Sequence, residues 1–208
     1  MDMNCPDMTY PDLAITGNCN ALPNCKRVLW FLLATVLLGV AVLRAETPNT
    51  GAKAPDFTLS TPEGAAVSLS SLEAKGPVVL IVLRGYPGYQ CPYCVRQAHD
   101  FQVNADKFAE KGAQVLLVYP GPPADLGAHA NEFLSKAGKL PANFHLVLDP
   151  DYKFTNQYDL RWNAEAETAY PSTFLIDRSG KIFFRKISHD HGDRTTASAI
   201  LAELAKPP

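Results

Sequence analysis

Four apolar runs separated by helical stretches limit the fold of this chain more than any other feature of its sequence. The first run, VVLIVL at 78–83, contains no polar residue and is bounded by Gly-Pro and Arg-Gly pairs. Such a run is typical of a strand that is covered on both faces. Similar runs occupy 114–119, 144–148 and 172–177, and stretches with helical character lie at about 91–111, 124–137 and 152–158. Strands that alternate with helices predict an α/β domain with a mainly parallel central sheet.

The C-terminal part of the chain predicts a hairpin and a closing helix. The segment STFLID at 172–177 passes through Arg-Ser-Gly into KIFFRK at 181–186, the pattern of two antiparallel strands joined by a turn. Residues 195–205 then predict the last helix. We place the domain at 54–208 and interpret residues 46–53, ETPNTGAK, as a linker that precedes it.

The first 45 residues differ in character from the rest. Residues 1–27 combine prolines, asparagines and acids without periodicity and are predicted to form a disordered leader. Residues 28–43 carry no charge, in a run longer than most signal-peptide cores and shorter than most membrane spans. We predict that 28–45 form a hydrophobic helix, either a cleaved signal or a retained anchor, with a buried helix of the domain as the weaker alternative. Lys26 and Arg27 favour a domain outside the cytoplasm, membrane-anchored or secreted, on the periplasmic side in a bacterium.

Charge and cysteine usage narrow the classes of function. The net charge is −2, the isoelectric point is about 6.2, and lysines and arginines form no basic stripe, which argues against a nucleic-acid partner. Cys5, Cys19 and Cys25 lie in the leader, where we expect free thiols or residues absent from the mature protein. Their loose spacing without a nearby histidine gives little support to a zinc site. The predicted domain retains Cys91 and Cys94 alone.

Cys91 and Cys94 form a Cys-x-x-Cys motif at the start of a predicted helix. Pro92 suits the first helical position, where a missing N–H costs nothing, so Cys91 is predicted to be the N-cap. Apolar residues continue from Cys94 at spacings of four, three, four and three along the helix, and predict a seam that faces the sheet. We therefore expect Cys91 at an exposed tip and Cys94 against the core.

This position favours redox chemistry. The thiolate is the nucleophilic form of cysteine, and a helix N-terminus can lower the pKa of a thiol from about 8.5 to between roughly 3.5 and 7.5. A second thiol one turn away can then resolve a mixed disulfide or a sulfenic acid as an internal disulfide. A pair of metal ligands and two structural cysteines are the weaker alternatives, because neither requires a helix N-cap.

The domain resembles the alkyl hydroperoxide reductase/thiol-specific antioxidant group of peroxiredoxins, within the thioredoxin-like fold. APDFTL at 54–59, VSLSSL at 67–72, YPGYQCPYC at 86–94 and STFLID carry this resemblance. The family motif is Pro-x-x-x-Thr-x-x-Cys, and here Pro87 and Cys94 match its ends while Cys91 occupies the threonine position. The resemblance implies that Cys94 attacks the peroxide. It also implies a peroxide-binding arginine beside the STFLID strand, where this chain has Pro171.

The same motif also resembles thioredoxins and glutaredoxins. In that branch of the fold the first cysteine attacks and the second resolves, and a cis-proline before a strand faces the pair. The resemblance therefore implies that Cys91 is the nucleophile and that the peptide bond before Pro171 is cis. The two resemblances assign opposite roles to Cys91 and Cys94, and the sequence leaves both assignments open.

Three functions follow from these observations. The first is an antioxidant thiol oxidoreductase that cycles a Cys91/Cys94 disulfide to reduce peroxides or, as the alternative, protein disulfides. It needs no cofactor, and its partner is an external thiol reductant, either thioredoxin-like or a small thiol. The second is a membrane-tethered copper-binding module with His189 or His191 as a further ligand. The third is a redox-inactive interaction domain.

Several other residues are candidates for the substrate pocket. Pro87, Tyr93 and Pro171 are included because they lie in or beside the two motifs. Arg84 or Arg96 is a candidate to hold the thiolate or a peroxide oxygen, with a solvent-exposed arginine as the more common alternative. Trp162 is predicted to pack under the loop that precedes Pro171.

Overall fold

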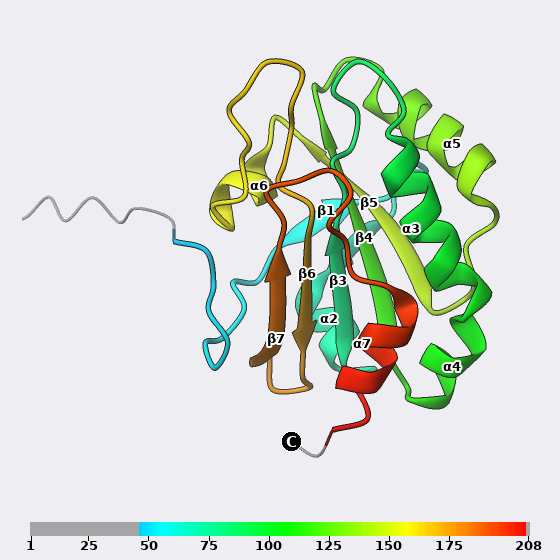
Figure 1. Ribbon diagram of the computed structural model, residues 1–208, viewed down its shortest axis with the longest axis vertical. Helices are drawn as coiled ribbons and strands as arrows, with labels where there is room; N and C mark the ends of the chain where they lie inside the picture. The colour runs from blue at the N-terminus through cyan, green and yellow to red at the C-terminus, as the bar shows by residue number, and fades with distance from the viewer. Residues whose placement is uncertain (1–45, 207–208) are drawn as a thin grey trace, which may run out of the picture. The chain divides into compact units, whose positions relative to one another are not determined.

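The computed structural model describes residues 46–206, which form a three-layer α/β domain with a central sheet between two layers of helices (Figure 1). The strands are β1 (Thr58–Ser60), β2 (Ala66–Ser68), β3 (Val78–Val82), β4 (Gln114–Gly121), β5 (Phe144–Pro150), β6 (Ser172–Ile176) and β7 (Ile182–Ile187). The helices are α2 (Leu69–Glu73), α3 (Pro92–Val103), α4 (Ala105–Glu110), α5 (Leu126–Ala137), α6 (Lys153–Gln157) and α7 (Ala197–Glu203). The predicted alternation of strands and helices is confirmed.

The sheet is mixed, so the prediction of a mainly parallel sheet is wrong in this respect. Its strand order is β2-β1-β5-β4-β3-β6-β7. Strand β4 pairs in parallel with β3 and β5, whereas β6 is antiparallel to both β3 and β7, and β1 is antiparallel to β2 and β5. A buried apolar run looks the same in a parallel and an antiparallel central strand. The hydrophobic pattern therefore identified the strands but not the direction of β6.

Two apolar cores lie on opposite faces of the sheet. Alternate residues of β3, such as Val79 and Ile81, pack with α3, α4, α5 and α7, while Val78 and Leu80 pack with α2, α6 and the aromatic ring of Tyr158. Every residue of β3 is buried, as expected for a strand covered on both faces. The two cores hold the carboxyl end of β3 in place, where the cysteine motif begins.

The predicted helix at 91–111 is interrupted at Asn104, which ends α3 and precedes α4. The seam that begins at Cys94 is nevertheless continuous through both helices, since Ala98, Phe101, Ala105 and Phe108 are all buried against the sheet.

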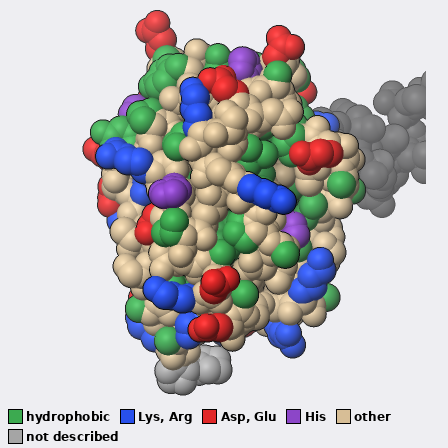
Figure 2. Space-filling view, turned by 90° about the vertical axis from the view of Figure 1, so that its right-hand side faces the viewer, with side chains coloured by type: hydrophobic (Ala, Val, Ile, Leu, Met, Phe, Trp, Pro, Cys, Tyr) green, Lys and Arg blue, Asp and Glu red, His purple; other side chains and the backbone are tan. Residues whose placement is uncertain are grey.

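Figure 2 views the side of the molecule that lies to the right in Figure 1, where acidic and basic side chains are interspersed.

The predicted leader and the hydrophobic segment 28–45 lie outside the described residues. Within residues 46–206, no helix has the length and apolar character needed to cross a bilayer. The end of the predicted linker is attached to the domain, because the N–H of Gly51 donates to the carbonyl of Ile182 and the carbonyl of Ala52 accepts from the N–H of Ile182.

Candidate active site

Three loops meet at the carboxyl end of β3, where the cysteine motif lies. Residues 83–91 leave β3 at this end. Because β6 runs antiparallel to β3, with Ser172 opposite Val82, the loop before β6 enters at the same edge. Ser172 also pairs with Ile187 at the end of β7, so the following loop, 188–196, starts there too. The antiparallel direction of β6 is thus what brings these distant segments together.

Cys91 and Cys94 are both free thiols at the start of α3. Cys91 is the N-cap and Pro92 occupies the first helical position, which confirms the local prediction. The expected exposed tip is wrong, because Cys91 is 1% exposed and Cys94 is 0% exposed. The helical pattern could place Cys94 on the buried seam, but it carried no information about the other loops that cover Cys91.

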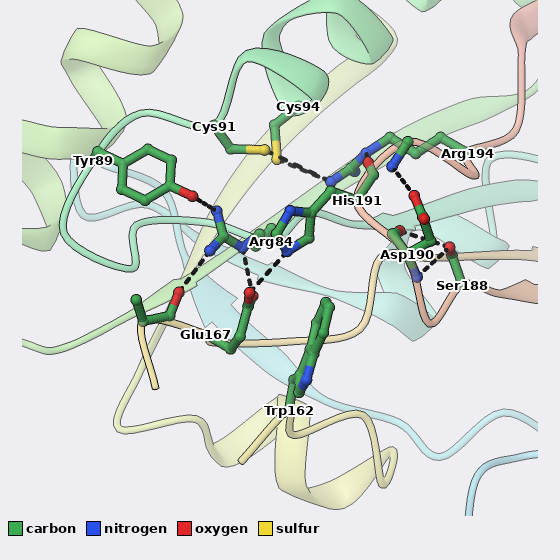
Figure 3. A network of polar contacts seen from close by, with 12 residues as sticks. Arg84, Tyr89, Cys91, Cys94, Trp162, Glu167, Ser188, Asp190, His191 and Arg194 are labelled. Atoms are coloured by element: carbon green, nitrogen blue, oxygen red, sulfur yellow. Dashed lines mark hydrogen bonds and ion pairs between the residues drawn. The ribbon is translucent and has the colours of Figure 1, made fainter. Parts of the chain in front are cut away.

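The guanidinium of Arg194 faces both sulfur atoms (Figure 3). Its Nη2 lies 3.4 Å from Sγ of Cys94 and 3.8 Å from Sγ of Cys91. The Nη1 atom donates to Oε1 of Gln97 at 3.0 Å, and Nε donates to the backbone carbonyl of His191 at 2.9 Å. Gln97 is itself buried and donates to the backbone carbonyl of Thr195. Arg194 is therefore fixed from two sides with one edge directed at the thiols.

The two thiols have different acidities. The hydrogen bond from Cys94, the charge of Arg194 and the backbone N–H of Cys94 together lower the pKa of Cys91 to about 5, although burial opposes this shift. Burial raises the pKa of Cys94, and so does its hydrogen bond to Cys91, despite the charge of Arg194. The position of Cys91 at a helix N-terminus also favours a negative charge there and so acts to lower its pKa further. The pair therefore holds its thiolate on Cys91 and its proton on Cys94.

Arg84 lies near the start of residues 83–91, which we call the cysteine loop. Its side chain is 2% exposed, so the alternative that Arg84 is a solvent-exposed arginine is wrong. Its Nε donates to Oε2 of Glu167 at 2.5 Å, Nη1 donates to the hydroxyl of Tyr89 at 2.6 Å, and Nη2 donates to the carbonyl of Ala166. Burial opposes its charge, but the bonds to Glu167 and Tyr89 outweigh it and raise the pKa of Arg84. The backbone of Arg84 acts to lower the pKa of Cys94, but burial outweighs this small effect. The side chain of Arg84 is paired with Glu167 and contacts neither sulfur.

The cysteine loop is anchored at both ends. Gly85 has a φ of +71°, and a Cβ added there would lie 1.8 Å from the carbonyl oxygen of Pro120, so this position needs glycine. Farther along, Gln90 accepts a hydrogen bond from the hydroxyl of Tyr119 at 2.9 Å and donates to the carbonyl of His129 at 2.8 Å. These contacts fix the position from which Cys91 begins α3.

Pro171 lies at the site, but the prediction of a cis peptide bond before it is wrong, since residues 46–206 contain no cis peptide bond. Its carbonyl accepts a hydrogen bond from the N–H of Ser188 at 2.9 Å, which extends the pairing of β6 with β7 by one step. An extended trans chain fits this ladder. Pro171 lines a small hollow together with Gln97, Thr173 and Arg194.

The other residues that the sequence analysis named as candidates have different surroundings. Pro87 is half-buried in the cysteine loop, and Tyr93 is exposed on the first turn of α3. Arg96, the other candidate to hold a thiolate, instead stacks on the ring of Tyr93 at 4.6 Å. Trp162 stacks on Tyr170 at 4.9 Å, directly before Pro171, as predicted.

The two histidines proposed as copper ligands have other partners. His189 packs edge-on against Tyr170, and Nε2 of His191 is bonded to Oε1 of Glu167 at 2.8 Å. In the described part of the chain, no three His, Cys, Asp or Glu side chains group as metal ligands. The copper-binding alternative therefore has no support.

Comparison with known proteins decides the family. The sequence model of the AhpC/TSA family matches residues 50–185. The chain belongs to the AhpC/TSA family. Peroxiredoxin Bcp of Bacillus subtilis is 33% identical over 153 residues, which cover 70% of this chain and 90% of the relative. The chloroplastic Peroxiredoxin Q of Oryza sativa subsp. japonica is 33% identical over 134 residues, which cover 64% of this chain and 57% of the relative. The chain thus spans little more than half the length of that AhpC/TSA-related protein.

Solved structures agree with the thioredoxin-like fold of this AhpC/TSA domain. Peroxidoxin BcpB from Mycobacterium tuberculosis is 25% identical, with a TM-score of 0.59 over 74% of this chain and 95% of the other. The thiol:disulfide interchange protein DsbE assigned in Chlorobium tepidum is 27% identical, with a TM-score of 0.57 over 76% of this chain and all of the other. Both branches of the fold that the sequence resembles are therefore represented among its structural neighbours.

Sequence reasoning missed Arg194 and Glu167, which complete the arrangement in this AhpC/TSA domain. Arg194 ends the segment SHDHGDR, which drew attention only for its histidines, and Glu167 lies in an unremarkable polar loop. The one available signal for Arg194 was that Pro171 replaces the arginine implied by the family resemblance, so a peroxide-binding cation would have to come from another segment. No local pattern pointed to the loop after β7 as its source.

Proposed function

We propose that this chain is a thiol peroxidase in which Cys91 attacks a small peroxide and Cys94 resolves the product. The observation that carries this proposal is the burial of both sulfurs beneath the guanidinium of Arg194. Such a site admits a small oxidant more readily than a folded protein. The names of its relatives, peroxiredoxins Bcp and Q, point the same way.

In the first half of the proposed cycle, the peroxide oxidises Cys91. The thiolate of Cys91 attacks one peroxide oxygen, an S–O bond forms and the O–O bond breaks, so that sulfur is oxidised to a sulfenic acid. The leaving group is an alkoxide, or hydroxide when the substrate is hydrogen peroxide, and it takes a proton from solvent and departs as an alcohol or as water. Arg194 stabilises the negative charge that develops on the oxygens. Arg194 acts here as a catalytic residue, because it faces the reacting sulfur at 3.8 Å.

The second half of the cycle uses Cys94. Its thiol loses a proton and attacks the sulfenic sulfur of Cys91, so an S–S bond forms and water leaves. An external dithiol, thioredoxin-like or small, then reduces the disulfide by thiol–disulfide exchange and is itself oxidised. The Cys-x-x-Cys spacing keeps the two sulfurs within one helical turn, so resolution needs no large rearrangement.

Reduction of disulfides is the second candidate function. The Cys-x-x-Cys motif at a helix N-cap and the similarity to the Chlorobium tepidum DsbE structure favour it. The same thiolate of Cys91 would then attack a disulfide sulfur, and Cys94 would release the mixed disulfide. The burial of Cys91 weighs against a bulky substrate, because a protein disulfide has to reach this sulfur in line.

Single-turnover kinetics of the reduced chain against hydrogen peroxide and against a small aromatic disulfide test the proposal. We expect the second-order rate constant for peroxide to exceed that of a free thiol at the same pH by at least about a hundredfold, as one well-placed electrostatic group supplies. A double Cys91→Ser, Cys94→Ser variant is the control. A fast reaction with the disulfide and a peroxide reaction no faster than that of free cysteine would reject the peroxidase in favour of the second function.

We also propose that residues 28–45 direct the domain out of the cytoplasm, as a cleaved signal or a retained anchor. The uncharged run and the preceding Lys26 and Arg27 support this proposal. Protease protection and membrane fractionation of a C-terminally tagged chain test it. Recovery of the full-length protein in the cytosolic fraction would contradict it.

A further inference from the structure

Glu167 joins two of the loops that close over the cysteines (Figure 3). Its Oε2 accepts from Nε of Arg84 at 2.5 Å, and its Oε1 faces Nε2 of His191 at 2.8 Å. The carboxylate is 10% exposed and Arg84 is 2% exposed, so this is a largely buried ion pair. Burial alone would raise the pKa of Glu167, but the hydrogen bonds from Arg84 and His191 outweigh it and lower this pKa. The carboxylate is therefore ionised at neutral pH.

The contacts continue from His191 to the sulfurs. The backbone carbonyl of His191 accepts from Nε of Arg194 at 2.9 Å, and Nη2 of Arg194 faces both thiols. The ring of His191 also packs against Trp162 at 5.2 Å, so two residues of the 161–170 loop hold its side chain. The side chain of His191 thus fixes the residue whose carbonyl orients Arg194.

The two arginines near the cysteines differ in whether a carboxylate pairs with their charge. Arg84 and Arg194 both approach the site, but the charge of Arg84 is paired with Glu167. Within residues 46–206, Arg194 is in no ion pair with a carboxylate. The side chains that its guanidinium contacts are those of Gln97, Cys91 and Cys94. The position of Arg194 therefore determines how much positive charge the thiolate experiences.

We infer that Glu167 and His191 are positioning residues, and that the carboxylate of Glu167 holds Arg194 over the cysteine pair through His191. This inference rests on the proposed thiol chemistry of Cys91 and extends it to Glu167 in the 161–170 loop and to the side chain of His191. Loss of the His191 side chain releases the 188–194 loop from Glu167 and lets Arg194 move away from the sulfurs. The thiolate of Cys91 then loses part of its stabilisation.

The test is the pH dependence of iodoacetamide alkylation at Cys91 in the full chain, read by peptide mass spectrometry that separates it from Cys94. Arg194→Met sets the scale, and its midpoint is expected to rise by about one unit, a tenfold loss of alkylation rate below the midpoint. His191→Ala is expected to give about a threefold loss, and His191→Gln, whose amide can donate to Glu167, to recover most of it. His189→Ala is the matched control, because this exposed histidine lies in the same loop and contacts Tyr170 instead.

An unchanged alkylation profile in His191→Ala, when Arg194→Met shifts it, would overturn the inference. So would an equal shift in His191→Ala and His191→Gln, since that result assigns His191 a role other than donation to Glu167. Glu167→Gln is a supporting variant, expected to shift the midpoint in the same direction. It leaves the buried charge of Arg84 unpaired and could unfold, whereas His191→Ala and His191→Gln both keep the Arg84–Glu167 pair, so their comparison decides the question without it. Alkylation needs no peroxide, so failure of the peroxidase proposal is recognised separately.

Discussion

The guanidinium of Arg194 lies 3.4 Å from the sulfur of Cys94, although the two residues are 100 positions apart in the sequence. Arg194 reaches this place because β6 and β7 are antiparallel to each other and β6 is antiparallel to β3. A cation fixed beside a pair of thiols stabilises a thiolate and, later, the oxygen that leaves a peroxide. The two thiols differ in acidity, because the pKa of Cys91 is lowered whereas burial raises that of Cys94.

Single replacement of the cysteines separates their roles. We expect Cys94→Ser to consume about one equivalent of hydrogen peroxide and to stall as a sulfenic acid on Cys91, because the resolving thiol is missing. Cys91→Ser is expected to be inactive, because burial raises the pKa of Cys94 and keeps it protonated. Peroxide consumption and trapping of sulfenic acid with dimedone measure both outcomes. The reverse pattern would assign the attack to Cys94, as the peroxiredoxin motif implies.

Replacement of Arg194 should slow the reaction with peroxide. We expect Arg194→Met to lower the second-order rate constant by about a hundredfold, as loss of one donor to a developing oxyanion does elsewhere. Arg194→Lys keeps the charge but not the planar contact with both sulfurs, so it should fall in between. Arg96→Met is the control, because Arg96 stacks on the exposed ring of Tyr93. Equal rates for Arg194→Met and the control would remove Arg194 from the mechanism.

The rate of peroxide reduction should depend on pH as expected for an acidic thiol. Because the pKa of Cys91 is lowered to about 5, its thiolate is fully formed at neutral pH. We expect a constant rate between about pH 6.5 and 8, and a tenfold fall per unit well below pH 5. Stopped-flow measurement of the reduced chain provides the profile. A rate that still rises tenfold per unit above pH 7 would show an unperturbed thiol.

The ion pair of Arg84 and Glu167 should make stability depend on pH. The pKa of Glu167 is lowered in the folded state, so its stabilisation is present above the ordinary value of 4.5 and is lost as pH falls through the folded value. At pH 7 we expect Glu167→Gln to lower the free energy of unfolding by about 3 kcal/mol, because it leaves a buried charge unpaired. The difference should narrow below about pH 4.

Chemical denaturation of the wild type and the Glu167→Gln variant at several pH values measures this difference. Glu165→Ala is the control in the same loop, since its side chain is exposed and should change stability by less than about 0.5 kcal/mol. A gap between wild type and Glu167→Gln that stays constant down to pH 3 would show that the carboxylate does not titrate with folding.

Local sequence patterns determined the strands from β3 onward, the helices that alternate with them and the position of the cysteine motif, but they did not predict β1, β2 or α2. The apolar run of β3 and the seam from Cys94 to Phe108 follow from the physical requirement that a strand or helix bury its apolar side chains. Pro92 likewise placed Cys91 at the helix N-cap through the missing N–H of proline. These features depend on neighbours within a few residues, so the sequence by itself was sufficient.

The tertiary structure decided which side chains surround the sulfurs. The direction of β6, the trans peptide bond before Pro171 and the burial of Cys91 depend on pairing with strands and loops far away in the sequence. Arg194 and Glu167 have no distinctive local pattern, because a charged residue in a polar loop looks the same whether it faces solvent or a thiolate. Their role arises only when three loops are brought to one end of β3, and that arrangement is a property of strand order rather than of any single segment.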